Sequence, residues 1–206
     1  MTALKKGLLV AIEGTDGTGK STQARRLQQY FSDLGIRTRY LREPTDGKYG
    51  REIRRLAREG RRQVSPRQEM ELFIRDRMED CERNIRPALD NRELVFIDRY
   101  YFSTIAYQGA LGLDTGEIWE RNEHIAVIPD LVLILDMPVE KALHRIIHQR
   151  GDTHDDFEKA DFLKKTRSIF QSMKRPYIHH LSADREPDAV FEAMREKISD
   201  LIEKHT

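Results

Sequence analysis

The chain has 206 residues, and its 36 Lys and Arg nearly balance its 35 Asp and Glu, so the formal net charge is +1. A charge this small provides no bulk field for nucleic acid or an anionic membrane, and neither is expected as a partner. The single cysteine, Cys81, excludes a disulfide framework and a thiolate metal cluster within one chain, and we expect it to be buried. No apolar stretch approaches the roughly 20 residues of a membrane span, so we expect a soluble, cytoplasmic protein. At roughly 150 residues per domain, residues 1–206 are expected to form one domain.

Five short apolar runs predict β-strands that are buried on both faces. They occupy residues 7–12, 38–41, 94–97, 131–135 and, with a weaker pattern, 177–181. Continuous apolar runs are typical of a parallel sheet that helices cover on both sides. The stretches between them show helical spacing, as in Val190, Met194 and Ile198 near the C-terminus. The alternation predicts an α/β fold.

Local signals mark one helix start, one helix face and one loop. Ser65, Pro66 and Gln68 form the pattern of a capping box with proline at the first helical position, which predicts a helix running through Cys81. The basic run 51–62 is expected to be the solvent-exposed face of a helix. Residues 149–158 are polar and acidic, and they predict a mobile loop between two helices.

The strongest functional signal follows the first predicted strand. Residues 14–21 satisfy the pattern G-x-x-x-x-G-K-[ST] of a phosphate-binding P-loop. Such a loop needs glycines so that backbone N–H groups can point into one concavity above a helix N-terminus. Lys20 is expected to reach the β- and γ-phosphates, and the Ser21 hydroxyl to ligate Mg²⁺. The residues predicted to bind ATP are Gly14, Thr15, Gly17, Thr18, Gly19, Lys20, Ser21 and Thr22.

A second carboxylate stands at the end of a predicted strand. Asp98 follows the run 94–97 and is placed to complete the Mg²⁺ shell, and Arg99 comes next to meet a phosphate. We therefore predict catalytic roles for Lys20, Asp98 and Arg99. Switch GTPases, motor ATPases and small-molecule kinases all fit these motifs, but the sequence has no Asn-Lys-x-Asp motif for reading guanine, which disfavours the GTPases.

These motifs, and others along nearly the whole chain, resemble the thymidylate kinase family. The resemblance runs through residues 12–22, Arg42-Glu43-Pro44, Leu72-Phe73 with Asp76-Arg77, and residues 98–109. It implies a P-loop kinase fold, in which three α/β/α layers contain a five-stranded parallel sheet of order 2-3-1-4-5, with a lid loop at 149–158. It also implies a homodimer that transfers the γ-phosphate of Mg-ATP to dTMP, with adenine contacts near residues 183–187.

The resemblance also assigns the residues of a dTMP site. Phe73 stacks on thymine, and Arg77, four residues further along the same helix face, donates to a base carbonyl. Asp16 accepts a hydrogen bond from the 3′-hydroxyl, and Tyr107 crowds the sugar 2′ position and so selects deoxyribose. The remaining contacts are Thr104 and Gln108 to the base, and Arg42, Arg54 and Arg99 to the monophosphate. Residue type alone leaves simpler interpretations open, with Phe73 in the core and Thr104 and Gln108 in local hydrogen bonds.

The lid departs from the family pattern. The family draws a catalytic arginine either from the P-loop, where this chain has Gly17, or from the lid, where this chain has Asp156. Loss of such an arginine costs on the order of 10³-fold in rate, so another cation is expected to replace it. Of the arginines that flank the lid, Arg145, Arg150 and Arg167, we predict that Arg150 is catalytic because it stands next to Gly151.

The loop 45–50 is a second departure, because many relatives carry glycines directly after the proline of Arg42-Glu43-Pro44. It borders the expected monophosphate site, and it leaves open a kinase for another or a modified pyrimidine deoxynucleotide. Asp156 leaves open a nucleotide-binding regulator without turnover. Transfer of phosphate from ATP to dTMP is the function that the motifs favour.

Overall fold

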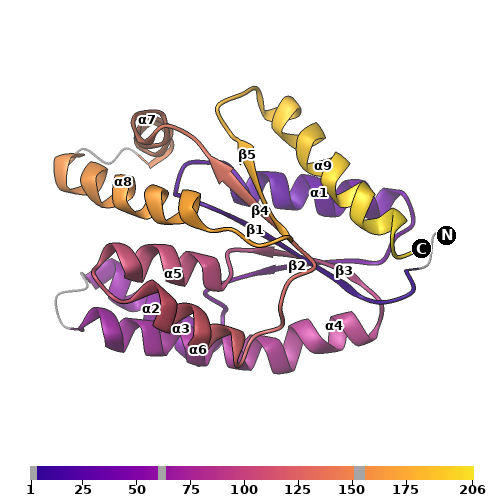
Figure 1. The fold of residues 1–206 in the computed structure, drawn as a ribbon, viewed down its shortest axis with the longest axis horizontal. Coiled ribbons are helices and arrows are strands. Elements are labelled where there is room, and N and C mark those ends of the chain that lie inside the picture. Colours follow the sequence, from indigo (N-terminus) through magenta and orange to yellow (C-terminus); the bar gives the residue numbers. More distant parts are fainter. Residues whose placement is uncertain (1–3, 60–63, 151–155) are drawn as a thin grey trace.

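Five parallel strands form the centre of the fold, and helices cover both faces of the sheet (Figure 1). The computed structural model describes residues 4–59, 64–150 and 156–206, and side chains in these ranges except those of 148–150 and 156–159. The strands are β1 (Leu8–Gly14), β2 (Thr38–Arg42), β3 (Leu94–Asp98), β4 (Leu131–Asp136) and β5 (Ile178–Ser182). The helices are α1 (Lys20–Asp33), α2 (Lys48–Glu59), α3 (Pro66–Asp80), α4 (Arg86–Asp90), α5 (Tyr101–Ala110), α6 (Thr115–Glu123), α7 (Val139–Arg150), α8 (Asp156–Ser172) and α9 (Pro187–Glu203).

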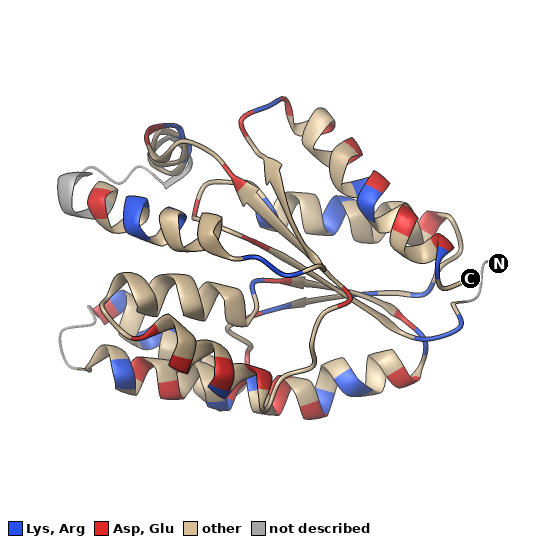
Figure 2. Cartoon of the chain, viewed as in Figure 1, with Lys and Arg blue, Asp and Glu red and all other residues tan. Residues whose placement is uncertain are grey.

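The order of the strands is β2-β3-β1-β4-β5, which confirms the predicted parallel sheet and its order. Alternate strand residues face two separate cores. One core joins Val10, Phe96 and Leu133 to helices α1 and α9. The other joins Ala11 and Ile97 to helices on the opposite face, among them α3, α5 and α6. Figure 2 shows charges of both signs interspersed on the helices, while the strands are largely uncharged.

The two edge strands are less buried than the sequence predicts. No residue of β2 is fully buried, and in β5 only Ile178 is. Each of these strands has only one neighbour in the sheet. Its other edge therefore has no strand beside it, and its side chains are less well covered than those of the central strands. The prediction of burial on both faces is therefore correct for β1 and β3, and for β4 apart from its last residue, and wrong for the edges.

The capping box at Ser65 is confirmed, and the helix that it begins runs on through Cys81 but changes there from α to π. Ser65 accepts from the backbone of Gln68, and the Gln68 side chain accepts from the backbone of Ser65. Helix α3 ends at Asp80 and a π-helical turn, Cys81–Ile85, leads into α4. Pro87 explains the wider turn, because it has no N–H for a carbonyl one turn back and its ring would collide there. Cys81 lies in this turn and is buried, as expected.

The predicted lid loop at 149–158 is too long. Helix α7 extends to Arg150, and α8 begins at Asp156, so both ends of the predicted loop are helical. Acidic residues are favourable in the first turn of a helix, which accounts for an early start of α8. Residues 151–155 lie outside the described part of the chain. Within the described ranges, no helix is both long enough and apolar enough to cross a membrane.

Ser65→Ala is predicted to lower the free energy of unfolding by about 1 kcal/mol, because it removes the N-cap of α3. In a chain of this size the melting temperature should fall by about 2–4 °C. Ser32→Ala, an exposed serine on α1, is the matched control and should leave thermal unfolding unchanged. Equal melting temperatures for Ser65→Ala and the wild type would show that the box does not stabilise the fold.

Candidate active site

The P-loop lies between the end of β1 and the start of α1, as its motif predicts. Gly17 adopts φ +85°, a backbone conformation that side-chain-bearing residues rarely take. A Cβ at this position would also lie 2.5 Å from the carbonyl oxygen of Ala142, at the start of α7. The backbone therefore requires glycine at position 17, and an arginine could not be accommodated there without moving α7 or the loop.

Lys20 is buried at the N-terminus of α1, and its ammonium donates to the carbonyl of Thr15 at 2.7 Å. Thr18 donates to the same carbonyl at 2.9 Å, so the loop closes on itself. Burial and the neighbouring Arg99 lower the pKa of Lys20 to about 7. A polyanion in the loop would favour the charged form of this amine.

Ser21 and Asp98 lie together, although they come from different elements. The Ser21 hydroxyl donates to Oδ2 of Asp98 at 2.5 Å. Asp98 is 1% exposed, and its Oδ1 has no hydrogen-bond partner among the residues described. A hydroxyl and a carboxylate are the oxygen ligands that Mg²⁺ prefers, so this pair fits the predicted metal site.

Arg99 connects the end of β3 to the P-loop. Its guanidinium pairs with Asp16 at 2.5 Å and lies over the ring of Tyr107, 5.4 Å from the centroid. The Tyr107 hydroxyl donates to Asp16 at 3.3 Å, and burial raises its pKa to about 12, so it remains a donor. Arg99 adopts φ +69°, which is uncommon for a residue with a side chain and often marks functional sites.

Glu13 holds this unusual turn, a role that is not among the predictions from sequence. It accepts from the backbone N–H groups of Tyr100 and Ser103 and from the Ser103 hydroxyl, at 2.7, 3.2 and 2.5 Å. Burial raises the pKa of Glu13 to about 6, while the bond from Ser103 opposes the rise. A carboxylate inside the otherwise apolar run of β1 is the signal that could have identified it.

Two cavities meet at the carboxyl ends of the central strands. The first, called here the α3–α5 cavity, has a volume of about 560 Å³. Every residue that the resemblance assigns to dTMP lines it: Asp16, Arg42, Arg54, Phe73, Arg77, Arg99, Thr104, Tyr107 and Gln108. Sequence positions as distant as 16 and 108 are thus brought to one space.

The second cavity, called here the P-loop cavity, has a volume of about 470 Å³. It is lined by P-loop residues 17–22 and by Arg145, Ala183, Arg185 and Pro187, which include the region expected to contact adenine. Gly14 and Thr15 do not line it and instead support the loop. Asp16, Arg42 and Arg99 line both cavities, so the two spaces meet at these side chains.

A buried polar network closes the far end of the α3–α5 cavity. Arg77, 1% exposed, donates to Glu43 and Asn122, and to the Thr104 hydroxyl at 3.2 Å. Burial raises the pKa of Glu43 to about 8 in spite of Arg77. Sequence analysis missed Glu43 and Asn122, because their contact with Arg77 spans 34 and 45 positions.

Other described side chains at this end also have protein partners. Gln108 donates to Glu69 at 2.8 Å, and Thr104 accepts from Arg77. These bonds span 39 and 27 positions, so they are not the local hydrogen bonds that residue type allows, and both residues line the cavity. Phe73 is half-buried and lines the cavity rather than lying wholly in the core.

The departing loop after Pro44 contacts a predicted phosphate ligand. Arg54 donates to the Pro44 carbonyl and pairs with Asp46, both at 2.8 Å. Thr45 is held by Asp76 through its backbone N–H and its hydroxyl, at 2.8 and 2.6 Å. Asp46 is exposed, so an incoming phosphate could displace it from Arg54 at small cost.

The lid arginines differ in what they contact. Arg145 lines the P-loop cavity, whereas Arg167 is bound to Asp136 by two hydrogen bonds of 2.6 and 2.9 Å. The side chains of Arg150 and Asp156 lie outside those described, so the predicted catalytic role of Arg150 remains a prediction.

Comparison with known proteins agrees with the sequence motifs. The profile of the family described as Thymidylate kinase matches residues 12–194. A relative named Thymidylate kinase from Desulfotalea psychrophila is 46% identical over 184 residues, or 89% of this chain and 90% of the relative. A relative of the same name from Brachyspira hyodysenteriae is 38% identical over 90% of this chain and 90% of its own length. Another, from Xanthomonas euvesicatoria pv. vesicatoria, is 44% identical over 89% of this chain and 80% of its own length. The matches confirm the resemblance and favour neither alternative function.

Nucleotide binding is predicted to take up a proton through Lys20. The free amine has a pKa of about 7 and is mostly neutral at pH 8, whereas phosphates beside it would keep it charged. Calorimetry of an ATP analogue in buffers of different ionisation enthalpy should show greater proton uptake at pH 8 than at pH 6. Lys20→Arg keeps a permanent charge and is the control that should abolish this difference. A binding enthalpy at pH 8 that is independent of the buffer would contradict the prediction.

Proposed function

Because the chain belongs to the thymidylate kinase family, we propose that it transfers the γ-phosphate of ATP to dTMP, giving dTDP. The observation that carries this proposal is the meeting of two cavities at Asp16, Arg42 and Arg99. A donor in the P-loop cavity and an acceptor in the α3–α5 cavity would face each other across these side chains. Such alignment of two bound reactants is a large part of catalysis in phosphoryl transfer.

The P-loop cavity is the proposed ATP site. The glycines and threonines of residues 17–22 would surround the phosphates, and Lys20 would contact the β- and γ-phosphates. Arg145 and residues 183–187 border the same space and would contact the rest of the nucleotide. The cationic walls oppose the negative charge that collects on the transferring group.

The α3–α5 cavity is the proposed dTMP site. Phe73 would stack on thymine, Arg77 would donate to a base carbonyl, and Thr104 and Gln108 would make polar contacts. The Glu43 and Asn122 contacts support the role of Arg77, since they fix its guanidinium at the cavity wall. At the other end, Asp16 would accept the 3′-hydroxyl and Tyr107 would crowd the 2′ position, while Arg42, Arg54 and Arg99 would bind the monophosphate.

Ser21 and Asp98 are proposed to hold Mg²⁺ together with phosphate oxygens. The described residues contain no group of three or more His, Cys, Asp or Glu that could hold a metal, so phosphates would supply part of the shell. When bound, the ion would neutralise charge on the β- and γ-phosphates. The partners are thus ATP, dTMP and Mg²⁺, and the family resemblance supports a homodimer that acts in the cytoplasm.

The reaction needs no strong general base in this arrangement. The acceptor phosphate of dTMP is ionised at neutral pH and is itself the nucleophile, so its oxygen attacks the γ-phosphorus as the bond to ADP breaks. The protein aligns the two anions and neutralises the charge between them. Lys20 lines the P-loop cavity and Arg99 lines both cavities, and Asp98 acts through the metal shell.

Activity is predicted with dTMP and to be at least about tenfold weaker with dUMP, which lacks one methyl group. ADP formation from Mg-ATP is measured with dTMP, dUMP, dCMP, dGMP, dAMP, UMP or no acceptor. Lys20→Ala should lose at least about 10²-fold in kcat, because a preorganised charge beside the transferring group is removed. Binding of ATP without turnover on any acceptor would refute the kinase proposal.

A lid cation is predicted to replace the family's lid arginine. Arg150 is the proposal from sequence, and Arg145 is the described lid arginine that lines the P-loop cavity. We expect Arg150→Ala or Arg145→Ala to lower kcat by more than tenfold, and Asp156→Arg to raise it. Lys141→Ala removes an exposed charge from α7, the helix that carries Arg145 and Arg150, and is the matched control. Losses below about tenfold in both arginine variants, or roughly 1.4 kcal/mol each, would show that neither is catalytic.

A further inference from the structure

Tyr40, on the edge strand β2, contacts the carboxylate proposed for the metal shell. Its hydroxyl donates to Oδ2 of Asp98 at 3.1 Å, and this oxygen also accepts from Ser21. Arg42 approaches the same oxygen at 3.8 Å through its Nε. Two hydroxyl donors and one guanidinium thus share a single carboxylate oxygen, while the other oxygen has no partner in the described ranges.

Strand register and helix spacing create this contact. Arg42 pairs with Asp98 and Tyr40 with Phe96, so alternate residues of β2 and β3 present Tyr40 and Asp98 on one face. Helix α1 packs on that face, as its residues Leu27 and Phe31 share a core with Phe96. Ser21 and Arg25 are four residues apart on α1 and lie on its same side. Ser21 therefore contacts Asp98, and Arg25, one turn further along α1, contacts Tyr40.

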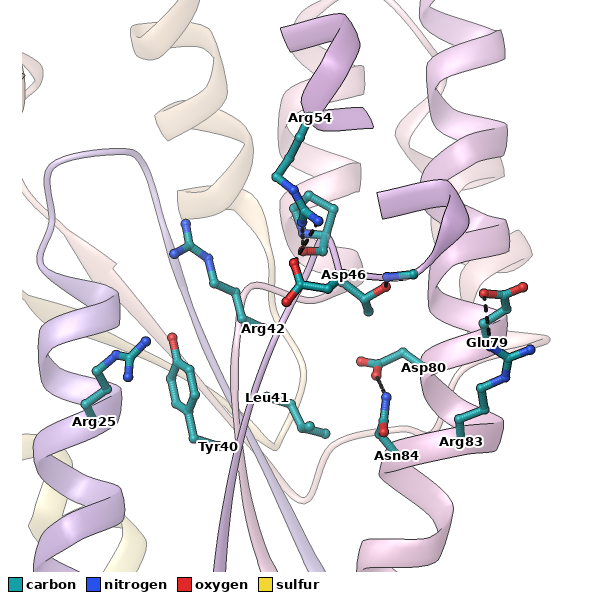
Figure 3. A pocket seen from close by; sticks show the side chains of 13 residues that line it. Arg25, Tyr40, Leu41, Arg42, Asp46, Arg54, Glu79, Asp80, Arg83 and Asn84 are labelled. Atoms are coloured by element: carbon teal, nitrogen blue, oxygen red, sulfur yellow. Dashed lines mark hydrogen bonds and ion pairs between the residues drawn. The ribbon is translucent and has the colours of Figure 1, made fainter. Parts of the chain in front are cut away.

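The ring of Tyr40 is held by a cation–π contact. The Arg25 guanidinium lies over it, 4.6 Å from the ring centroid. Figure 3 shows the hydroxyl of Tyr40 between the ends of Arg25 and Arg42, at one end of a cavity of about 780 Å³ beside β2. This contact and the hydrogen bond to Asp98 both favour the ring position in which the hydroxyl is directed toward Asp98.

We propose that Tyr40 is a positioning residue of the metal site, which fixes the Asp98 carboxylate so that the Ser21 hydroxyl keeps donating its hydrogen bond to Oδ2. A hydroxyl has one proton and two lone pairs, so while Ser21 donates to Asp98 its lone pairs are left for a cation. A second donor on Oδ2 opposes rotation of the carboxylate away from Ser21. This inference rests on the proposed function of Ser21 and Asp98.

The chemistry of tyrosine suits this role better than that of a basic residue. A neutral phenol holds the carboxylate without cancelling the charge that attracts a divalent cation, whereas an ammonium in its place would compete with the cation. A phenol ordinarily titrates at about pH 10, so the Tyr40 hydroxyl is a donor at neutral pH. Groups that orient metal ligands in this way commonly contribute 10-fold to 100-fold in metal affinity or activity.

Mn²⁺ serves as a paramagnetic probe in place of Mg²⁺. Its binding to the full chain, in the presence of a non-hydrolysable ATP analogue, is measured by electron paramagnetic resonance. Tyr40→Phe keeps the ring and removes only the hydroxyl. Its dissociation constant for Mn²⁺ should rise about tenfold, and half-saturation of turnover by Mg²⁺ should shift in the same direction. The KM for dTMP should stay within twofold, because Tyr40 does not line the α3–α5 cavity.

Tyr30→Phe is the matched control, since it removes a hydroxyl from α1 in a ring cluster outside both substrate cavities. Mn²⁺ affinity within twofold of wild type in Tyr40→Phe would overturn the inference, even if its melting temperature fell. Equal losses in both variants would also overturn it, because the effect would then be one of general stability. Absence of Mn²⁺ binding to the wild-type nucleotide complex would instead count against the proposed metal site itself.

Discussion

One buried carboxylate determines the shape of the candidate active site. Glu13 accepts from two backbone N–H groups and a hydroxyl at the start of α5, and these bonds stabilise the left-handed turn at Arg99. Held in this turn, Arg99 reaches back to Asp16 of the P-loop. A residue of β1 therefore joins the phosphate-binding loop to the end of β3. The cost of burying Glu13 is offset by its hydrogen bonds, which a solvent-exposed glutamate would not keep.

The parallel sheet explains why so many functional groups converge. The carboxyl ends of β1, β2 and β3 lie next to one another at one edge of the sheet, and each end contributes charged side chains. Arg42 and Asp98 are register partners there, and Ser21 and Tyr40 approach from the same face. Cations and anions alternate across this edge, so phosphates can be bound without leaving any one charge isolated.

The sequence predicts the parts of the fold and site that local patterns encode. The strand order, the P-loop, the capping box at Ser65 and the lining of the α3–α5 cavity follow from periodicity, motif or resemblance. Glu43, Asn122 and Tyr40 could not be predicted, because each acts through a partner 34 to 58 positions away. Glu13 stands out in the sequence only as a carboxylate in an apolar strand, since its partners lie 87 and 90 positions away. The exposure of β2 depends on tertiary position, since apolar content alone does not distinguish an edge strand from a central one. The π-helical turn depends on Pro87, which helical spacing alone does not take into account.

The most direct measurement is a structure of the chain with a bisubstrate analogue in which adenosine and thymidine are joined through phosphates. We expect one molecule per chain that spans both cavities, with thymine beside Phe73 and phosphates between Arg42 and Arg99. A molecule confined to one cavity, or one whose phosphates bypass Arg99, would contradict the claim that the two spaces are the two halves of one active site.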